Sequence, residues 1–255
     1  MEKNILLTIE YDGTNFSGWQ RQPEVRTVQG EIEKVLSKLC AQPIKINGTS
    51  RTDAGVHALG QRASFKAEFG IPTDRIMLAA NNMLCGGMHS VKGVGDVRII
   101  EVQEVDDDFH ARFSCIGKKY RYVIKNSPDA DIFRRNYCYQ VPAELDVAAM
   151  RRAAEYIKGT HDFKCFQAAG GEEKETTVRT IHSLDIYRDG EDVKIEVSGD
   201  GFLYNMVRII SGTLVEVGLG KKEPDDLAEI IASCDRRRAG HTAPAEGLYL
   251  VEIYF

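Results

Sequence analysis

The residues best suited to chemistry lie in one short stretch, from Gly48 to Gly60, which reads G-T-S-R-T-D-A-G-V-H-A-L-G. Its mixture of glycines, hydroxyls and charges is typical of a loop. Asp53 lies two residues after Arg51, and a nearby cation favours the ionised form of a carboxylate. Asp53 is therefore a candidate nucleophile or base. The same composition is also typical of an ordinary turn, in which an aspartate bonds to nearby backbone amides, and both interpretations remain open here.

Arg208 and His57 each have a structural and a chemical interpretation. Arg208 lies inside a predicted helix, Leu203 to Val217, roughly opposite its apolar stripe by the helical period of about 3.6 residues. It is either solvated or able to cross to Asp53 and grip the carboxylate with two parallel hydrogen bonds. His57 follows Asp53 by four residues, and a lone histidine in a polar loop is interpreted as structural.

The run K-K-Y-R-Y carries two tyrosines with a similar ambiguity. Alternation along a strand directs Tyr120 and Tyr122 to one face of a sheet and Lys119 and Arg121 to the other. The run is either a half-buried strand or an aromatic platform on which a flipped base stacks.

Several enzyme classes lack their motifs in this chain. There is no G-x-x-x-x-G-K-[ST], G-x-G-x-x-G, G-x-S-x-G or H-E-x-x-H sequence, which argues against nucleotide-driven, hydride-transfer and zinc-hydrolase chemistry. The six cysteines form no C-x-x-C pair and no metal-ligand spacing, so we expect reduced, mostly buried thiols in a cytoplasmic protein. The first ten residues hold no apolar run long enough for a signal peptide, and no stretch approaches the roughly 20 apolar residues of a membrane span, so we expect neither secretion nor membrane insertion.

The bulk composition suits a globular protein of one large or two medium domains, with 255 residues of which 43% are hydrophobic and 28% charged. A net charge of -5 argues against indiscriminate nucleic-acid binding. Basic residues nevertheless cluster, and each cluster is either solvated or part of a face that binds a polyanion. The hypothetical binding residues are Arg134, Arg135 and Arg236 to Arg238, beside a further cluster at Lys118, Lys119 and Arg121.

The first 105 residues are predicted to follow the order βαββαβ. The patterns predict strands at 4–11, 44–47, 61–67 and 97–102, helices that begin at the caps Thr27 and Thr73, and a glycine-rich stretch at 86–95. Trp19, in the loop after the first strand, is interpreted as a core anchor. This order is the split βαβ arrangement of ferredoxin-like units. Asp53 falls on the connection between the second and third strands.

Residues 106–255 are predicted to repeat this order with insertions, although no repeated sequence supports a duplication. Strands are predicted at 120–125, 137–141, 177–187, 193–197 and 248–255, with helices after Asp146, at 203–217 and at 225–231. Asp189-Gly190 predicts a hairpin. We therefore expect an α+β fold of two ferredoxin-like halves, 1–105 and 106–255. They would join in a mainly antiparallel sheet with helices on one face and a cleft between them.

The loop R-T-D-A-G-V-H-A, Arg51 to Ala58, resembles the signature of the TruA family of tRNA pseudouridine synthases. Five further segments match the family in the right order, and position 50, often glycine there, is Ser50 here. The matching segments are Y-D-G-T-N-F-S-G-W-Q (11–20), K-K-Y-R-Y (118–122), H-D-F-K-C-F (161–166), F-L-Y-N-M-V-R-I-I-S-G-T-L (202–214) and T-A-P-A-E-G-L-Y-L (242–250).

The resemblance implies an enzyme that isomerises uridine to pseudouridine at positions 38, 39 and 40 of the tRNA anticodon stem-loop, without cofactor or metal. It implies a homodimer in which each tRNA contacts both subunits. By the motif match, Asp53 is the catalytic aspartate, Arg51 a supporting arginine and Arg208 the salt-bridge partner of Asp53. Tyr120 is the family's tyrosine, expected to stack on the base and to take part in proton transfer.

The chemistry of this reaction suits these residue types. A carboxylate must attack the sugar or remove a proton from it, and a pocket must retain the detached uracil. Whether Asp53 is nucleophile or base stays open. Two rival interpretations are a non-catalytic tandem RNA-binding protein, which would need the RNP1 pattern that this chain lacks, and a carboxylate hydrolase, which would need a second acid near Asp53.

Overall fold

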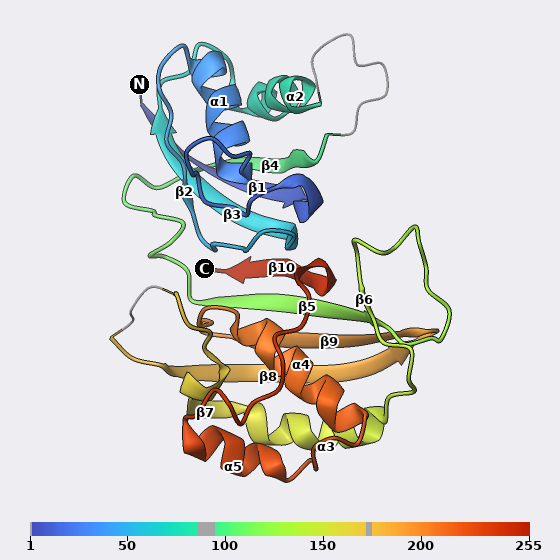
Figure 1. The fold of residues 1–255 in the computed structure, drawn as a ribbon. Coiled ribbons are helices and arrows are strands. Elements are labelled where there is room, and N and C mark those ends of the chain that lie inside the picture. The colour runs from blue at the N-terminus through green and yellow to red at the C-terminus, as the bar shows by residue number, and fades with distance from the viewer. Residues whose placement is uncertain (1, 86–94, 172–174) are drawn as a thin grey trace. The chain divides into compact units, whose positions relative to one another are not determined.

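The computed structural model describes residues 2–85, 95–171 and 175–255 (Figure 1). The fold is α+β, with mixed, mainly antiparallel strand pairing. Its contacts divide the chain into unit 1, Met1–Cys115 with Leu250–Phe255, and unit 2, Ile116–Tyr249. The predicted glycine-rich stretch lies, except for Gly95, outside the described residues. No described helix is long and apolar enough to cross a membrane.

Unit 1 has the predicted order βαββαβ. The strands pair in the order β4-β1-β3, with β2 and β10 both next to β3, and the β1–β3, β1–β4 and β2–β3 pairs are antiparallel. The helices α1 and α2 lie on the same side of these strands (Figure 1). The elements are β1 (Lys3–Tyr11), α1 (Val28–Cys40), β2 (Asn47–Gly48), β3 (His57–Ala67), α2 (Thr73–Leu84), β4 (Val97–Val105) and β10 (Leu248–Tyr254), with a 3₁₀ turn at Gly13–Asn15.

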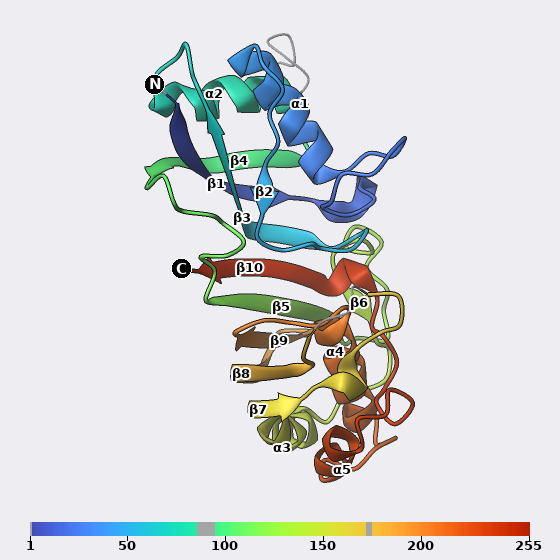
Figure 2. The same ribbon diagram turned by 90° about the vertical axis from the view of Figure 1, so that its left-hand side faces the viewer.

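Unit 2 has the strand order β5-β9-β8-β7, with β6 joined in parallel to β5. Helix α3 packs against β8 and α4, and α5 packs against α3, so the helices gather to one side of these strands (Figure 2). The elements are β5 (Gly117–Lys125), β6 (Tyr139–Gln140), α3 (Val147–Ile157), β7 (Gly159–Asp162), β8 (Val178–Asp189), β9 (Asp192–Gly199), α4 (Met206–Gly218) and α5 (Asp226–Ser233), with 3₁₀ turns at Lys164–Phe166 and Ala245–Gly247.

The structure confirms the predicted N-caps of two helices and the predicted hairpin turn. Thr27 caps α1 by accepting a hydrogen bond from the Gly30 amide, and Asp146 caps α3 by accepting one from Ala149. The β8–β9 hairpin turns at Gly190, which has a φ of +60°. The cap predicted at Thr73 is wrong, because Pro72 occupies the N-cap of α2 and the Thr73 hydroxyl bonds to Glu104 instead.

The strand predicted at 44–47 is also wrong for its first three residues. Ile44 and Ile46 are buried, which produced the alternating pattern, but their backbone groups bond to side chains of α1. Ser37 accepts from the Ile44 amide, Glu33 accepts from the Ile46 amide, and Gln29 donates to the Ile46 carbonyl. Side chains thus satisfy the groups that a strand partner would satisfy.

Other elements also differ from the sequence patterns in their bounds or in their presence. β3 begins at His57 and β2 includes Gly48, so both ends of the predicted 48–60 loop belong to strands. The strand predicted at 137–141 is reduced to Tyr139–Gln140. The short strand β7 was not predicted, and its pairing with β8 supplies the hydrogen bonds that its polar sequence alone does not suggest.

Helix α4 is buried on nearly all sides, although the sequence predicts a single apolar stripe. Eleven of its residues are buried, among them Ser211 and Thr213. Both hydroxyls donate to the carbonyl one turn earlier, at Val207 and Ile209, so their burial leaves no unsatisfied donor. The helix is therefore a central element of unit 2 rather than a surface helix.

Candidate active site

The loop that carries Asp53 is anchored on its inner side by the segment after β1. The Trp19 amide donates to the Thr52 carbonyl at 3.0 Å, and the Tyr11 and Thr52 hydroxyls lie 2.7 Å apart. The Val56 amide donates to the Asp53 carbonyl at 3.2 Å and closes the turn. Trp19 is 2% exposed, as a core anchor should be. These contacts fix the backbone on both sides of a half-buried Asp53.

The part of the loop before Asp53 is held by a buried side-chain amide. Gln61, fully buried in β3, donates to the Ser50 carbonyl at 2.7 Å and accepts from the Ser50 amide at 3.2 Å. Thr49 donates through its hydroxyl to the carbonyl of Ala111 at 2.9 Å. Ser50 itself is 3% exposed, which agrees with the requirement for a small residue at this position.

Two glycines let the segment after β1 approach the Asp53 loop. A side chain at Gly18, whose φ is +87°, would place its Cβ 2.8 Å from the Thr52 carbonyl oxygen. A Cβ at Gly13 would lie 2.1 Å from the carbonyl oxygen of Val56. Two of the segments that resemble the family, 11–20 and 51–58, are therefore packed backbone to backbone.

His57 has a structural environment, as the sequence indicated. It is 2% exposed, and its Nδ1 accepts a hydrogen bond from the Gly13 amide at 3.1 Å. The same nitrogen lies 3.3 Å from a carboxylate oxygen of Asp12. The ring thus holds the turn after β1 in place, whereas Arg51, on the other side of Asp53, is exposed.

Tyr120 and Tyr122 share one face of β5, as alternation predicts. Tyr120 is 8% exposed and meets Phe202 edge to face, with ring centroids 5.1 Å apart. Tyr122 is fully buried and donates to the Pro244 carbonyl at 2.7 Å, and burial raises the pKa of its phenol far above its ordinary value. Tyr122 therefore has a structural environment, while a small part of Tyr120 stays exposed.

The cations of K-K-Y-R-Y lie on the opposite face and are paired within the sheet. Lys119 and Arg121 lie 2.6 and 2.7 Å from the two carboxylate oxygens of Glu196 on β9. Burial opposes ionisation of this carboxyl, but the hydrogen bonds from the two cations lower the pKa of Glu196 to about 2.

Arg208 is half-buried and is held at the start of α4 by intramolecular hydrogen bonds. Its Nε donates to the Ala243 carbonyl at 2.7 Å, and one terminal nitrogen donates to Asn205 Oδ1 at 2.7 Å. Asn205 takes a left-handed conformation, with φ of +58°, at the N-cap of the helix. The Ala243 carbonyl and the Asn205 side chain, which belong to different segments, thus help to orient the guanidinium plane.

The predicted site residues divide between the two units. Arg51 and Asp53 share one loop of unit 1, and Tyr120 and Arg208 belong to unit 2. Within unit 2, residues of one short segment contact both Tyr120 and Arg208. Phe202 packs against Tyr120, and Asn205 accepts a hydrogen bond from Arg208. No sequence pattern indicated a role for Phe202 or Asn205, although both lie inside the matching segment 202–214.

The clusters proposed to bind a polyanion are largely occupied by intramolecular partners. Arg134 makes two hydrogen bonds to Asp192, of 3.0 and 2.7 Å. Arg237 pairs with Asp235 at 2.7 Å and Arg238 pairs with Glu229 at 3.0 Å. Arg236 and Arg135 bond to backbone carbonyls, at Gly240 and Ile132. These partners weigh against a binding role for most of the hypothetical residues.

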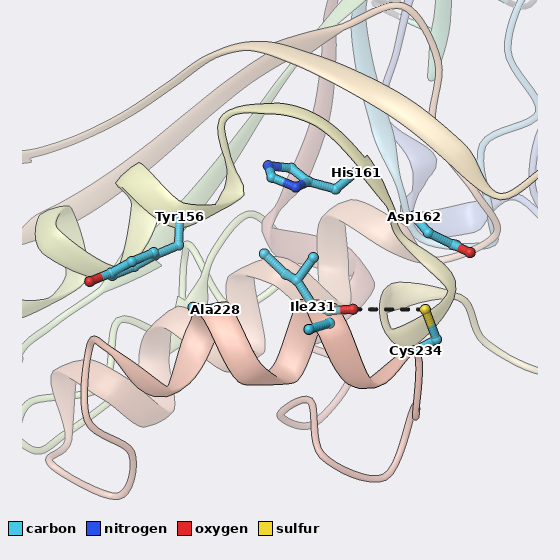
Figure 3. Close-up of a pocket in the computed structure, with 7 residues that line it drawn as sticks. Tyr156, His161, Asp162, Ala228, Ile231 and Cys234 are labelled. Carbon is cyan, nitrogen blue, oxygen red and sulfur yellow. Dashed lines mark hydrogen bonds between the residues drawn. The ribbon is translucent and has the colours of Figure 1, made fainter.

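Unit 2 contains a mainly apolar cavity of about 400 Å³ that is separate from these residues (Figure 3). The Cys234 thiol donates to the Ile231 carbonyl at its wall. None of the four predicted site residues lines it, so it is not the candidate active site. The lining residues are Tyr156, His161, Asp162, Ala228, Ile231, Ala232 and Cys234.

The cysteines are free thiols, two of them buried and four half-buried, so fewer are buried than the sequence analysis expects. Burial raises the pKa of Cys165 to about 12, which keeps that thiol protonated. Among residues 2–85, 95–171 and 175–255, no group of three or more histidine, cysteine or acidic side chains could hold a metal ion.

Comparisons with known proteins agree with the resemblance. A family model described as tRNA pseudouridine synthase matches residues 7–114 and 153–255. A tRNA pseudouridine synthase A of Acetivibrio thermocellus is 51% identical over 253 residues, covering 99% of this chain and 100% of that protein. One of Ruminiclostridium cellulolyticum is 51% identical over 254 residues, with the same coverage. A tRNA pseudouridine synthase A 2 of Clostridium tetani is 48% identical over 257 residues and covers both chains fully.

Proposed function

The chain belongs to the tRNA pseudouridine synthase A (TruA) family, and on that premise we propose that it converts uridines 38, 39 and 40 of tRNA to pseudouridine. The enzyme is an isomerase that acts on uridine in the tRNA anticodon stem-loop. Similarity along the whole chain carries this conclusion, and the anchored Asp53 loop supports it. A non-catalytic RNA-binding protein would not require a carboxylate held on a loop with so many backbone bonds.

The reaction needs one carboxylate and a way to retain a base. The bond between the sugar C1′ and uracil N1 breaks, a bond between C1′ and C5 forms, N1 gains a proton and C5 loses one. We propose Asp53 as the group that acts on the sugar, either as a nucleophile at C1′ or as a base toward a neighbouring proton. No redox step and no nucleotide energy is required, so the proposal includes no cofactor.

Arg208, Tyr120 and Arg51 are proposed to support Asp53. An arginine whose guanidinium is fixed by two acceptors is suited to pair with a carboxylate and keep it ionised, and we assign Arg208 this role toward Asp53. Tyr120, in contact with Phe202, would stack its ring on the flipped uracil and take part in proton transfer. The exposed Arg51 would contact the RNA beside the loop.

The assembly and the division into halves belong to the same proposal. We infer a cytoplasmic homodimer in which each tRNA contacts both subunits, and two ferredoxin-like halves, 1–105 and 106–255, with the catalytic aspartate in the first. The antiparallel order β4-β1-β3-β2 in unit 1 supports a ferredoxin-like first half. Light scattering at known protein concentration would test the dimer.

The Asp53→Ala variant tests the function. Tritium release from unmodified tRNA labelled at C5 of uridine measures the reaction, because only formation of the C5 glycoside expels that hydrogen. We expect no release above background from the variant, while its circular dichroism and tRNA affinity stay as in the wild type. Tritium release by the variant at the wild-type rate would contradict the role of Asp53, and no release by the wild type would contradict the function.

A further inference from the structure

Residues 240–244, here called the return segment, run along α4 and bond to it at several points. The Gly240 amide donates to the Thr213 hydroxyl at 2.8 Å, and the His241 amide donates to Glu216 Oε1 at 2.9 Å. The imidazole Nδ1 of His241 lies 3.0 Å from the same Glu216 oxygen. The segment is therefore held by side chains of α4 along its first two residues.

The end of the return segment bonds to Arg208. The Ala243 amide donates to the Arg208 carbonyl at 3.1 Å, and Arg208 Nε donates to the Ala243 carbonyl at 2.7 Å. Pro244, the next residue, accepts from the Tyr122 hydroxyl at 2.7 Å. Because the Ala243 carbonyl accepts a hydrogen bond from the guanidinium, a shift of this segment would change the direction in which Arg208 points.

The approach between the return segment and α4 is as close as backbones allow. A Cβ at Gly212 would lie 2.0 Å from the His241 carbonyl oxygen, and a Cβ at Gly240 would lie 2.6 Å from Thr213 Cα. Only glycine fits at these two positions without displacing backbone. The return segment thus fits against the helix in one position only, and its displacement would move the Ala243 carbonyl.

Arg236 also binds the return segment, through both of its terminal nitrogens. One terminal nitrogen of Arg236 donates to the Gly240 carbonyl at 2.9 Å and the other to the Thr242 hydroxyl at 3.1 Å. Its neighbour Arg237 is 89% exposed and bonds to Asp235, outside the segment. The two adjacent arginines therefore make different contacts. Only Arg236 of the two bonds to the return segment, which in turn orients Arg208.

We propose that Arg236 and Glu216 are positioning residues for the isomerisation, because they hold the return segment so that the Ala243 carbonyl fixes the Arg208 guanidinium. Neither residue touches the substrate in this proposal. It rests on the proposed function, in which Arg208 pairs with the catalytic Asp53. It also gives Arg236 a task other than the RNA contact suggested by its place in a basic cluster.

The first experiment compares Arg236→Met with Arg237→Met in the full-length enzyme, using C5-tritiated unmodified tRNA. We expect Arg236→Met to lower kcat about tenfold with KM nearly unchanged, since a misplaced catalytic group loses rate rather than binding. Arg237→Met, the matched control, should keep both parameters. Equal losses in both variants, or a rise in KM with kcat unchanged, would overturn the positioning role.

Variants that keep the charge of Arg236 separate positioning from a direct RNA contact. Thr242→Val removes one hydrogen bond to Arg236 and leaves its charge, so a several-fold loss of kcat is expected. Glu216→Gln keeps an oxygen for the His241 amide and should retain most activity, whereas Glu216→Leu should lose it. If Thr242→Val and Glu216→Leu both keep the wild-type kcat, the proposal is contradicted. Misfolding cannot explain that result, because a misfolded enzyme would not keep its activity.

A double-mutant cycle distinguishes failure of this inference from failure of the proposed function. Lysine at position 208 cannot offer the planar Nε donor that Ala243 accepts. If Arg236 acts through Arg208, Arg236→Met should cost less than about twofold in the Arg208→Lys background. Additive losses would overturn the inference alone, because they show that the two residues act independently. An unchanged kcat in Arg208→Lys itself would instead contradict the role assigned to Arg208 in the proposed function.

Discussion

Gln61 and Ser50 form two hydrogen bonds with each other at the base of the Asp53 loop. The Gln61 amide nitrogen donates to the Ser50 carbonyl at 2.7 Å, and the Gln61 amide oxygen accepts from the Ser50 amide at 3.2 Å. Gln61 is fully buried, so the pair is shielded from water. The side chain of a β3 residue thereby replaces a strand partner for the backbone of Ser50. The position of Asp53, three residues later, depends on this contact.

We therefore predict that Gln61→Leu both destabilises the protein and slows catalysis. The substitution removes both hydrogen bonds that Gln61 makes to the backbone of the buried Ser50, and the loss of such a bond costs roughly 1–3 kcal/mol for each buried group. The free energy of unfolding from urea titration should fall by about 2 kcal/mol or more, and single-turnover tritium release should slow. Gln103→Leu on the exposed side of β4 is the control. An unchanged unfolding midpoint in Gln61→Leu would contradict the prediction.

Gly212→Ala should destabilise the protein although alanine is the better helix former. The gain in helix propensity is about 1 kcal/mol, but the new Cβ would overlap the His241 carbonyl oxygen at 2.0 Å. Overpacking of this kind costs roughly 1–3 kcal/mol, so the net change should be destabilising and visible as a lower Tm. At Gly70 a Cβ meets nothing within 4 Å, and Gly70→Ala should leave the Tm unchanged or higher.

The stabilising effect of Glu196 should depend on pH. Lys119 and Arg121 depress the folded-state pKa of Glu196 to about 2 from an ordinary value of 4.5. A depressed pKa contributes stability that is present above pH 4.5 and is lost as pH falls toward 2. The free energy lost in Glu196→Gln, about 1 kcal/mol after allowance for solvent screening, should shrink over that window.

Urea titrations of wild type and Glu196→Gln at several pH values measure this change. Glu144→Gln, at an exposed residue, serves as the control for a substitution that removes one charge. If the difference between wild type and Glu196→Gln is the same at pH 6 and pH 3, the ion pairs with Lys119 and Arg121 do not stabilise the fold.

Neutralising Arg51 and neutralising the paired arginines should affect RNA binding differently. Arg237 and Arg238 already pair with Asp235 and Glu229, so replacing both by glutamine should leave tRNA affinity and its salt dependence almost unchanged. Arg51→Gln should weaken binding and reduce the slope of log affinity against log salt by about 1. Filter binding across a salt series measures both. A large loss of slope in the double variant would restore the cluster as a binding face.

The sequence by itself determined the family, the βαββαβ order of unit 1 and the position of the candidate catalytic loop. It also placed the starts of α1 and α3, because capping by Thr27 and Asp146 uses an amide three residues away. Such signals lie within a few positions of one another, so their geometry is fixed by the helix itself. The matching segments did not depend on structure at all.

The tertiary structure decided everything that joins residues far apart in the chain. Arg208 is oriented by Ala243, 35 positions later, and the backbone of Ile46 is satisfied by Glu33, 13 positions earlier. The pairing of Lys119 with Glu196 likewise needs the β5–β9 register. No local pattern encodes these contacts, because packing of the elements selects which acceptors come within reach. The sequence therefore identified Arg208, whereas only the fold showed what holds it.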